Sequence, residues 1–402
     1  MLPGCRGKPA TNKHRMNTEL SHFATRLRGL ISNFQTPIAD CQFSELALEL
    51  FALQFQHNFA YHKICAARNL TPATVKDWSQ IPAVPTSAFK ELELTSIPPQ
   101  ERTAVFHSSG TTEQKPSRHF HSAESLAVYE ASLWMWFEQN LFSNSNLKIQ
   151  NSNLIYLTPP PEQVPHSSLV HMFETVWQKL GGASVPVSRS KFLGQLDSDG
   201  AWTLDFEATL TALADNSKLK TQNPKLILGT AFSFVHLLDY LVECDLRVEL
   251  PAGSRVMETG GYKNRSRTLP KAELHALITE RLGVPRENII CEYGMSELSS
   301  QAYAVTSDEW RVASKTAATH HSSPITHHFK FPPWARVQIL SPETGREVAE
   351  GETGLIRIFD LANVFSVAAI QTEDLGVRRG DGFELVGRAQ LAEPRGCSLM
   401  TA

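Results

Sequence analysis

The chain has 402 residues, of which 42% are hydrophobic, so its length allows one large core or two to three ordinary ones. Its 38 lysines and arginines against 41 aspartates and glutamates give no support to nucleic acid or an anionic membrane as a partner. No apolar run approaches the roughly 18 residues of a membrane span. Six scattered cysteines without a C-x-x-C pair favour free thiols in a reducing cytoplasm over a disulfide framework or a zinc site.

Residues 1–15 carry four lysines and arginines, no acid and no apolar core of a secretory signal, so we expect a disordered extension, with Met16 as an alternative start. Apolar residues at helical spacing predict a helix from Asn17 to Leu30 and a second helix from Phe43 to Arg68. Both helices are expected to serve as scaffold.

A hydroxyl-rich segment follows a predicted strand at Thr103–Phe106 and precedes a predicted helix at Ser122–Gln139. Backbone N–H groups in such a turn point at an anion, hydroxyls donate to phosphate oxygens and a lysine adds a mobile positive charge. The residues predicted to contact phosphate, and hence to bind ATP, are Ser108, Ser109, Gly110, Thr111, Thr112 and Lys115. The alternative is a Ser/Thr-rich surface turn, because short motifs also occur by chance.

Beyond this loop, apolar runs alternate with helical patterns, which predicts an α/β sheet with ligands at the carboxyl ends of its strands. The predicted strands are 154–157, 226–228, 255–257 and 288–290, and the predicted helices are 167–180, 206–214, 232–243 and 269–282. After His320 the pattern changes to short strands at 335–340, 354–359 and 383–386. We therefore expect an α/β core at 16–320 and a small β-rich subdomain at 321–402.

Three further segments occur downstream in a fixed order: 258–263 (ETGGYK), 292–297 (EYGMSE) and 372–376 (TEDLG), the last followed by Gly387-Arg388. Together with the hydroxyl-rich loop they resemble the signatures of the adenylate-forming superfamily of acyl-CoA synthetases, luciferases and adenylation domains. Within it, the stretches 258–267, 331–336 and 393–399 resemble LuxE-type acyl-protein synthetases. The resemblance runs from about Met16 to the end and implies the superfamily's large domain, with helix-flanked β-sheets and a small β subdomain.

The resemblance implies a role for each residue of the Tyr-Gly-Met-Ser-Glu turn. Glu297 would hold the Mg²⁺ that bridges ATP phosphates, because a hard oxygen ligand beside polyphosphate suits magnesium. Its alternative is a solvated surface acid. Tyr293 and Gly294 would lie at the adenine face, and Ser296 would donate near the phosphate.

The remaining motif residues are assigned to the nucleoside. Gly260 and Gly261 would let the backbone approach adenine closely, which a side chain would forbid. Asp374 would accept hydrogen bonds from both ribose hydroxyls. Arg388 would contact ribose or phosphate, or be a plain exposed arginine.

Two departures from the superfamily pattern bear on catalysis. Relatives carry a catalytic lysine on a mobile C-terminal domain, and we expect this domain to be absent here. The hypothesis is that Lys263 replaces that lysine by offsetting charge on the α-phosphate. Glu113 stands where the loop usually has glycine, which adds backbone strain and charge repulsion. ATP affinity would then be poor, or the pocket would accept another phosphate donor.

Cys397 matches the place where LuxE-type proteins carry a cysteine that takes the acyl group as a thioester. Arg395 would favour the thiolate and Gly396 would give flexibility, whereas the alternative is an inert tail thiol. The fifteen histidines form no convincing metal set. Only His107, beside the phosphate loop, is considered for the substrate carboxylate, with a structural role as its alternative.

The expected function is ATP- and Mg²⁺-dependent activation of a fatty acid through Glu297 and Lys263, with transfer of the acyl group to Cys397 and then to a partner reductase. That the fatty acid has a long chain is implied by the family resemblance alone. Two alternatives stay open. One is a ligase that delivers the acyl group to coenzyme A or another small acceptor. The other is a non-catalytic protein that binds the acid or the nucleotide.

Overall fold

The computed structural model describes residues 16–34, 38–108, 115–142, 153–181, 190–198, 200–214, 223–260, 267, 269–304 and 328–389. The expected N-terminal extension and the tail that contains Cys397 lie outside these ranges. None of the described helices has the length and apolar character needed to cross a membrane.

Helices occur along most of the described chain. The α-helices are α1 (Met16–Ser32), α2 (Asp40–His57), α3 (Phe59–Ala67), α4 (Ala88–Glu91), α5 (Ala123–Leu141), α6 (Ser168–Lys179), α7 (Phe206–Ala214), α8 (Ala231–Glu243) and α9 (Lys271–Leu282). Short 3₁₀ turns are η1 (Trp78–Gln80), η2 (Pro99–Glu101) and η6 (Arg286–Asn288).

Twelve of the described strands form one sheet, in the order β13-β14-β15-β16-β12-β11-β10-β9-β8-β4-β5, with β1 paired to β15. Its strands are β1 (Val84–Pro85), β4 (Asn153–Tyr156), β5 (Ser190–Phe192), β8 (Lys225–Thr230), β9 (Arg255–Thr259), β10 (Ile289–Tyr293), β11 (Ala302–Ala304), β12 (His328–Lys330), β13 (Ala335–Leu340), β14 (Thr353–Asp360), β15 (Ala369–Arg379) and β16 (Gly382–Arg388). Two hairpins stand apart, β2 (Ala104–His107) with β3 (Arg118–His121), and β6 (Gly194–Leu196) with β7 (Trp202–Leu204).

One half of the sheet is parallel and buried on both faces. Strands β5, β4, β8, β9 and β10 run parallel to one another. One face packs on α7, α8 and α9, and the other packs on α5 and α6. Such double coverage explains the nearly continuous burial of β9 and β10. The expected α/β sheet flanked by helices is therefore confirmed.

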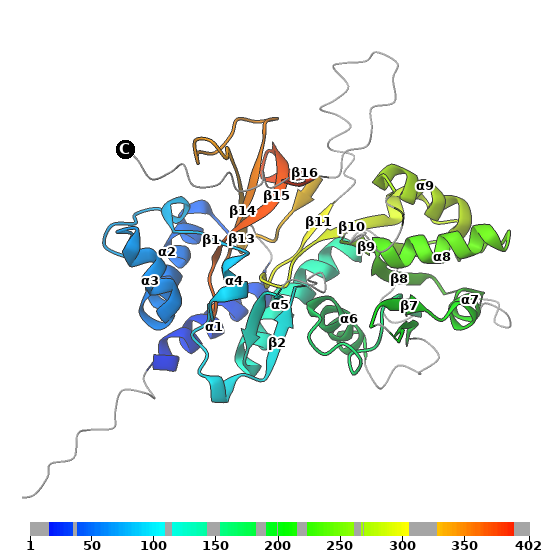
Figure 1. Cartoon of the computed structure of the whole chain (residues 1–402), viewed down its shortest axis with the longest axis horizontal. Coiled ribbons are helices and arrows are strands. Elements are labelled where there is room, and N and C mark those ends of the chain that lie inside the picture. Colours follow the sequence, from blue (N-terminus) through cyan, green and yellow to red (C-terminus); the bar gives the residue numbers. More distant parts are fainter. Residues whose placement is uncertain are drawn as a thin grey trace, which may run out of the picture.

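The other half of the sheet is mainly antiparallel and carries the N-terminal helices. Strand β11 joins the halves, because it pairs with β10 on one side and with β12 on the other. One buried cluster unites apolar side chains of α1 to α3 with those of β13 to β15, and includes the fully buried Trp334. Figure 1 shows α1 to α3 beside β13 and β14, with α7 to α9 at the far side of the molecule. Helices α1 to α3 therefore pack on strands β13 to β15.

The prediction of one helix from Phe43 to Arg68 is wrong, because the chain leaves helical geometry at Asn58. This residue has φ −102° and ψ 98°, and its side chain accepts a hydrogen bond from the Tyr61 N–H, so it caps α3. Apolar periodicity continues through the break, and for this reason the pattern alone joined the two helices.

The hydroxyl-rich loop also has a different setting from the one predicted. It connects β2 to β3, which pair antiparallel, and α5 starts only after β3. The predicted strand before the loop is present as β2, but β3 was missed because it consists of Arg118, His119, Phe120 and His121. His119 and His121 point into the protein, so polar residue types fill the inward positions of this strand.

The predicted β runs at 335–340, 354–359 and 383–386 lie in β13, β14 and β16, whereas β15 was not predicted. The proposed boundary at residue 320 lies outside the described residues. The division into a core and a β-rich subdomain stays a prediction.

Candidate active site

Two of the motif segments leave the sheet at the same edge. Strands β9 and β10 are parallel neighbours, and Thr259 lies opposite Glu292 at their carboxyl ends. Gly260 follows β9 with φ +71°, a left-handed conformation that glycine adopts without strain. A Cβ on Gly294 would lie 2.4 Å from Glu292 Oε1. Gly260 therefore adopts a backbone conformation that favours glycine, whereas a Cβ at Gly294 would meet the end of the Glu292 side chain. The pairing of β9 with β10 places the starts of the two predicted nucleotide turns on neighbouring strands.

Tyr293, Asp374 and Arg388 meet beside these turns. The Tyr293 hydroxyl donates to Asp374 Oδ2 at 2.8 Å, and Arg388 Nε lies 3.7 Å from Asp374 Oδ1. Asp374 and Arg388 are register partners on β15 and β16. Burial raises the pKa of Asp374, although the Tyr293 hydroxyl and the Arg388 charge act in the opposite direction. The structure thus assembles a carboxylate with a hydroxyl and a guanidinium from three separate segments.

Glu297 is buried, with 4% of its surface exposed, so the alternative of a solvated surface acid is wrong. The Ser296 hydroxyl donates to Glu297 Oε2 at 3.1 Å and lies 3.4 Å from the Ser117 hydroxyl. Burial raises the pKa of Glu297, while the Ser117 and Ser296 hydroxyls moderate the rise. A buried carboxylate with two hydroxyl oxygens is a hard oxygen donor set, which fits Mg²⁺.

The end of the hydroxyl-rich loop reaches this carboxylate through β3. Ser108 Oγ accepts from the Ser117 N–H at 3.0 Å and so closes the base of the loop. His119 Nδ1 lies 2.9 Å from the Ser296 carbonyl oxygen. Lys115 instead forms an exposed pair with Glu91, at 3.4 Å between Nζ and Oε2. The loop base therefore contacts the Ser296 turn, whereas Lys115 points toward Glu91.

Seven predicted site residues lie outside the described part of the chain, and their roles stay predictions. They are Ser109, Gly110, Thr111, Thr112, Gly261, Lys263 and Cys397. The departure at Glu113 lies outside it as well.

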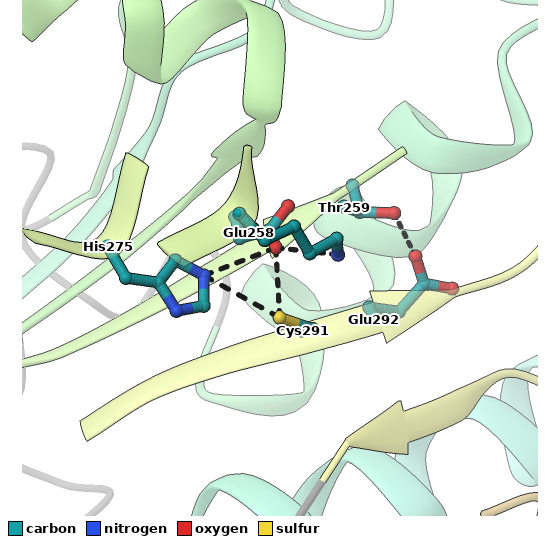
Figure 2. Close-up of polar contacts among 6 residues, drawn as sticks. Glu258, Thr259, His275, Cys291 and Glu292 are labelled. Carbon is teal, nitrogen blue, oxygen red and sulfur yellow. Dashed lines mark hydrogen bonds and ion pairs between the residues drawn. The ribbon is translucent and has the colours of Figure 1, made fainter. Parts of the chain in front are cut away.

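A buried polar cluster that the sequence did not predict lies under the Gly260 turn. Glu258 Oε1 is 2.8 Å from Lys271 Nζ, 3.4 Å from His275 Nε2 and 2.9 Å from Cys291 Sγ. Figure 2 shows Glu258, His275 and Cys291 pointing toward one another. Burial alone would raise the pKa of Glu258, but the Lys271 ammonium and the hydrogen bonds lower it to about 2.

Glu258, His275 and Cys291 are donor types that bind metal ions, and they are close enough to share one. The Lys271 ammonium, however, already balances the carboxylate at 2.8 Å. Burial and the Glu258 charge raise the pKa of Cys291 well above its usual value, so the sulfur is held as a thiol. We therefore interpret the cluster as a buried ion pair beneath the glycine turn.

Glu292 lies on the opposite face of β10 from Cys291. It accepts a hydrogen bond from the Thr259 hydroxyl, as Figure 2 shows, and it is the register partner of Tyr303 on β11. Burial raises the pKa of Glu292 to about 7. This buried acid is the first residue of the 292–297 segment, but sequence reasoning gave it no role.

The histidines near the loop occupy structural positions. The rings of His119 and His121 lie 4.3 Å apart, on one side of β3. His121 Nδ1 is 3.1 Å from the Ser125 hydroxyl. Burial lowers the pKa of His119 to about 4. The His107 ring lies 4.7 Å from that of His166, and its proposed contact with a substrate carboxylate stays a prediction.

The chain is similar to known proteins in sequence and in fold. The sequence profile of the family described as acyl-protein synthetase, LuxE, matches residues 183–402. A long-chain-fatty-acid–luciferin-component ligase of Aliivibrio fischeri is 25% identical over 379 residues, which cover 89% of this chain and 87% of that protein.

Two solved structures extend the comparison to the fold. An open conformation of 2-hydroxyisobutyryl-CoA ligase with 2-HIB-AMP and CoA aligns over 95% of this chain and 80% of its own, with a TM-score of 0.53 at 14% identity, which shows the fold alone. The amide bond synthetase McbA of Marinactinospora thermotolerans aligns over 73% of this chain at 17% identity with a TM-score of 0.45, too low to carry an argument. The alignment covers 50% of that enzyme.

Proposed function

The chain belongs to the LuxE acyl-protein synthetase family and is an ATP-dependent ligase, and from this premise we propose that it activates a long-chain fatty acid as the acyl-adenylate. The acyl group then passes to Cys397 and from there to a partner protein, for which an acyl reductase of the same cytoplasm is the proposed candidate. The observation that carries the proposal is the buried Glu297 carboxylate beside the Ser117 and Ser296 hydroxyls.

The described residues divide the work of nucleotide binding between two groups. Glu297 would hold Mg²⁺ at the phosphates, with Ser296 and Ser117 as hydroxyl donors. Asp374 would accept from the ribose hydroxyls, and Tyr293 fixes the direction of that carboxylate through its 2.8 Å hydrogen bond. Tyr293 and Gly294 stand a few residues before Glu297 in the chain, and Gly260 has no heavy atom within 4 Å of the position that a Cβ would occupy.

The proposed chemistry has two displacement steps. A carboxylate oxygen of the fatty acid attacks the α-phosphorus of ATP, an O–P bond forms and pyrophosphate leaves with the electron pair of the broken P–O bond. The Cys397 thiolate then attacks the acyl carbonyl carbon, a C–S bond forms and AMP leaves. Lys263, three residues after Gly260, is proposed to offset the charge on the α-phosphate.

The state of the other thiols supports Cys397 as the acyl acceptor. Among the cysteines of the described residues, Cys65 and Cys291 are buried. Burial raises the pKa of Cys65 to about 11 and that of Cys291 well above its usual value, so neither is a ready thiolate. Cys41 and Cys244 are exposed, but they lie on or next to α2 and α8, away from the motif turns.

The first experiment is pyrophosphate release by the purified protein with MgATP across a panel of carboxylic acids that differ in length and in aromatic character. Release that depends on long-chain fatty acids would support the proposal and fix the substrate class. No release from any acid by folded protein would contradict it and favour a binding protein. The Lys263→Met variant tests the catalytic cation, since an unchanged rate would exclude that role.

Acyl transfer is tested with a radiolabelled fatty acid and MgATP in the absence of any other acceptor. We expect label on the wild-type protein, released by neutral hydroxylamine as a thioester, and no label on the Cys397→Ser variant. The Cys244→Ser variant serves as the matched control. Pyrophosphate release without protein labelling, combined with acyl-CoA formation when coenzyme A is added, would instead identify a ligase with a small acceptor.

A further inference from the structure

Residues 360–368, which comprise the last residue of β14 and the turn that leads to β15, form hydrogen bonds with the Glu297 segment. We infer that Asp360 and Asn363 are positioning residues for Glu297, and that this turn sets the affinity of the magnesium site. The inference rests on the proposed role of Glu297. Neither residue belongs to the motifs that assign nucleotide contacts.

Asp360 fastens the chain just after Glu297. It is fully buried, and its Oδ2 accepts from the Ser299 N–H at 3.0 Å and the Ser300 N–H at 2.8 Å. Its Oδ1 accepts from the Ser300 hydroxyl at 2.7 Å and from the Ala362 N–H at 2.9 Å. Four donors on one carboxylate offset the cost of burying its charge. Ser299 and Ser300, two and three positions after Glu297, are therefore held to the end of β14.

Asn363 contacts Glu297 itself. Its Nδ2 donates to the Glu297 carbonyl oxygen at 2.9 Å and to the Val367 carbonyl oxygen at 3.1 Å. Because both neighbours of Nδ2 are carbonyl acceptors, the amide orientation is fixed by the hydrogen bonds. The peptide that follows the Glu297 side chain is thus pinned at its oxygen, which limits rotation of the backbone that aims the carboxylate.

The 360–368 turn also forms hydrogen bonds with side chains of the N-terminal helical segment. Gln54 of α2 donates to the Asn363 carbonyl oxygen at 2.7 Å and accepts from the Ala368 N–H at 3.0 Å. Asn58 donates to the Ser366 carbonyl oxygen at 3.2 Å. These side chains are buried, so water does not compete for the contacts. The path from α2 to the Glu297 carbonyl therefore runs through two hydrogen-bonded side chains.

The 360–368 turn also makes a buried hydrogen bond to a segment other than that of Glu297. The Ser366 hydroxyl of the same turn donates to the Leu94 carbonyl oxygen at 2.8 Å. Ser366 thus offers a matched control, because its loss removes one buried hydrogen bond of the same turn without removing a contact to Glu297.

The test measures Mn²⁺ binding in the presence of α,β-methylene-ATP by electron paramagnetic resonance, in place of activity. We expect Asn363→Ala to raise the Mn²⁺ dissociation constant about tenfold, the size of one lost hydrogen bond that positions a ligand. Asn363→Ser, whose hydroxyl is too short to reach the Glu297 carbonyl, is expected to do the same and serves if the alanine variant does not fold. Ser366→Ala is expected to bind Mn²⁺ as the wild type does.

The Glu297→Gln variant separates failure of this inference from failure of the proposed function. If Glu297→Gln weakens Mn²⁺ binding but Asn363→Ala and Asn363→Ser do not, the positioning role is wrong and the metal role stands. If Glu297→Gln binds Mn²⁺ normally, or if the wild type binds none, the proposed metal site is wrong and the inference falls with it. Equal weakening by Ser366→Ala would reduce the effect to general destabilisation and would also overturn the inference.

Discussion

Glu258 and Glu292 lie on neighbouring strands at the same edge, yet their pKa values move in opposite directions. The Lys271 ammonium and two hydrogen-bond donors overcome the effect of burial at Glu258 and lower its pKa to about 2. Burial prevails at Glu292 and raises its pKa to about 7, although its carboxylate accepts a hydrogen bond from the Thr259 hydroxyl. The environment of each carboxylate, rather than its residue type, therefore decides its charge at neutral pH.

This difference predicts a pH dependence of stability. The ordinary pKa of glutamate is 4.5, and the folded value at Glu292 is about 7, so protonation favours the folded state. As pH rises from 4.5 to 7, the unfolded state loses the proton of this carboxyl while the folded state retains it, so the free energy of unfolding falls. Relative to Glu292→Gln, the wild type should lose up to about 3 kcal/mol of unfolding free energy across this window.

Urea unfolding of the wild type and of Glu292→Gln at matched pH values checks this prediction. The comparison cancels the contribution of Asp360, whose pKa is also raised by burial, to about 6. A difference in unfolding free energy that is constant from pH 4.5 to 7 would show that Glu292 does not titrate as expected.

The ribose contact proposed for Asp374 gives a second prediction at this scale. Asp374→Ala removes a carboxylate that would accept charge-assisted hydrogen bonds, so the KM for ATP in pyrophosphate release should rise about tenfold or more. Glu373→Ala is the control, because it removes a carboxylate from the adjacent position of β15 and leaves Asp374 unchanged. An unchanged KM for Asp374→Ala would remove this residue from the nucleotide site.

Sequence reasoning predicted candidate site residues within short motifs and missed the residues that contact them from other parts of the fold. Tyr293, Glu297 and Asp374 stand in recognisable segments. Asn363 acts on Glu297 from 66 residues away, and Gln54 acts on Asn363 from a distance of 309 residues. No local pattern links such partners, because only the folded sheet brings α2, β14 and the Glu297 turn together.

At the scale of elements, Asn58 shows how a single residue sets the end of a helix. Apolar spacing runs from α2 into α3, but the Asn58 side chain satisfies the Tyr61 N–H and donates to the Ser366 carbonyl oxygen. Periodicity reports which face is buried, whereas a cap with a distant partner decides where the chain turns. The same reasoning applies to β3, where buried histidines concealed the strand.

Asn58→Ala should therefore cost more than the loss of an ordinary helix cap. Ser167 caps α6 by accepting from the Val170 N–H at 3.3 Å, and Ser167→Ala should cost about 1 kcal/mol. Asn58→Ala also leaves a buried carbonyl of the 360–368 turn without its donor, so we expect about 2 to 3 kcal/mol. Urea midpoints of the two variants measure the difference, and equal losses would show that Asn58 acts only as a cap.

At the scale of the whole molecule, the sequence predicted the α/β class but not where the N-terminal helices pack. Their apolar stripes indicated burial without identifying the partner surface. In the structure, α1 to α3 share one core with β13 to β15, and the Gln54 contacts lie inside that interface. The first helices and the last strands thus form one packed unit around the turn that supports Glu297.

This arrangement predicts that the two halves of the sheet unfold together. Cys65 on α3 and Cys291 on β10 are fully buried members of the same cluster, although they lie far apart in the sequence. In a variant that keeps only these two cysteines, both thiols should become reactive at the same urea concentration, because exposing either one requires opening the shared core.

Pulsed labelling with a thiol reagent after equilibration in urea, followed by mass spectrometry of the peptides, measures the two midpoints separately. Single-cysteine variants that retain only Cys65 or only Cys291 provide the control for reagent access. Labelling of Cys65 at a lower urea concentration than Cys291 would show that α1 to α3 detach first. In that case the anchor of Asn363 through Gln54 would be lost while the parallel strands remain folded, and metal binding should fail before the α/β sheet unfolds.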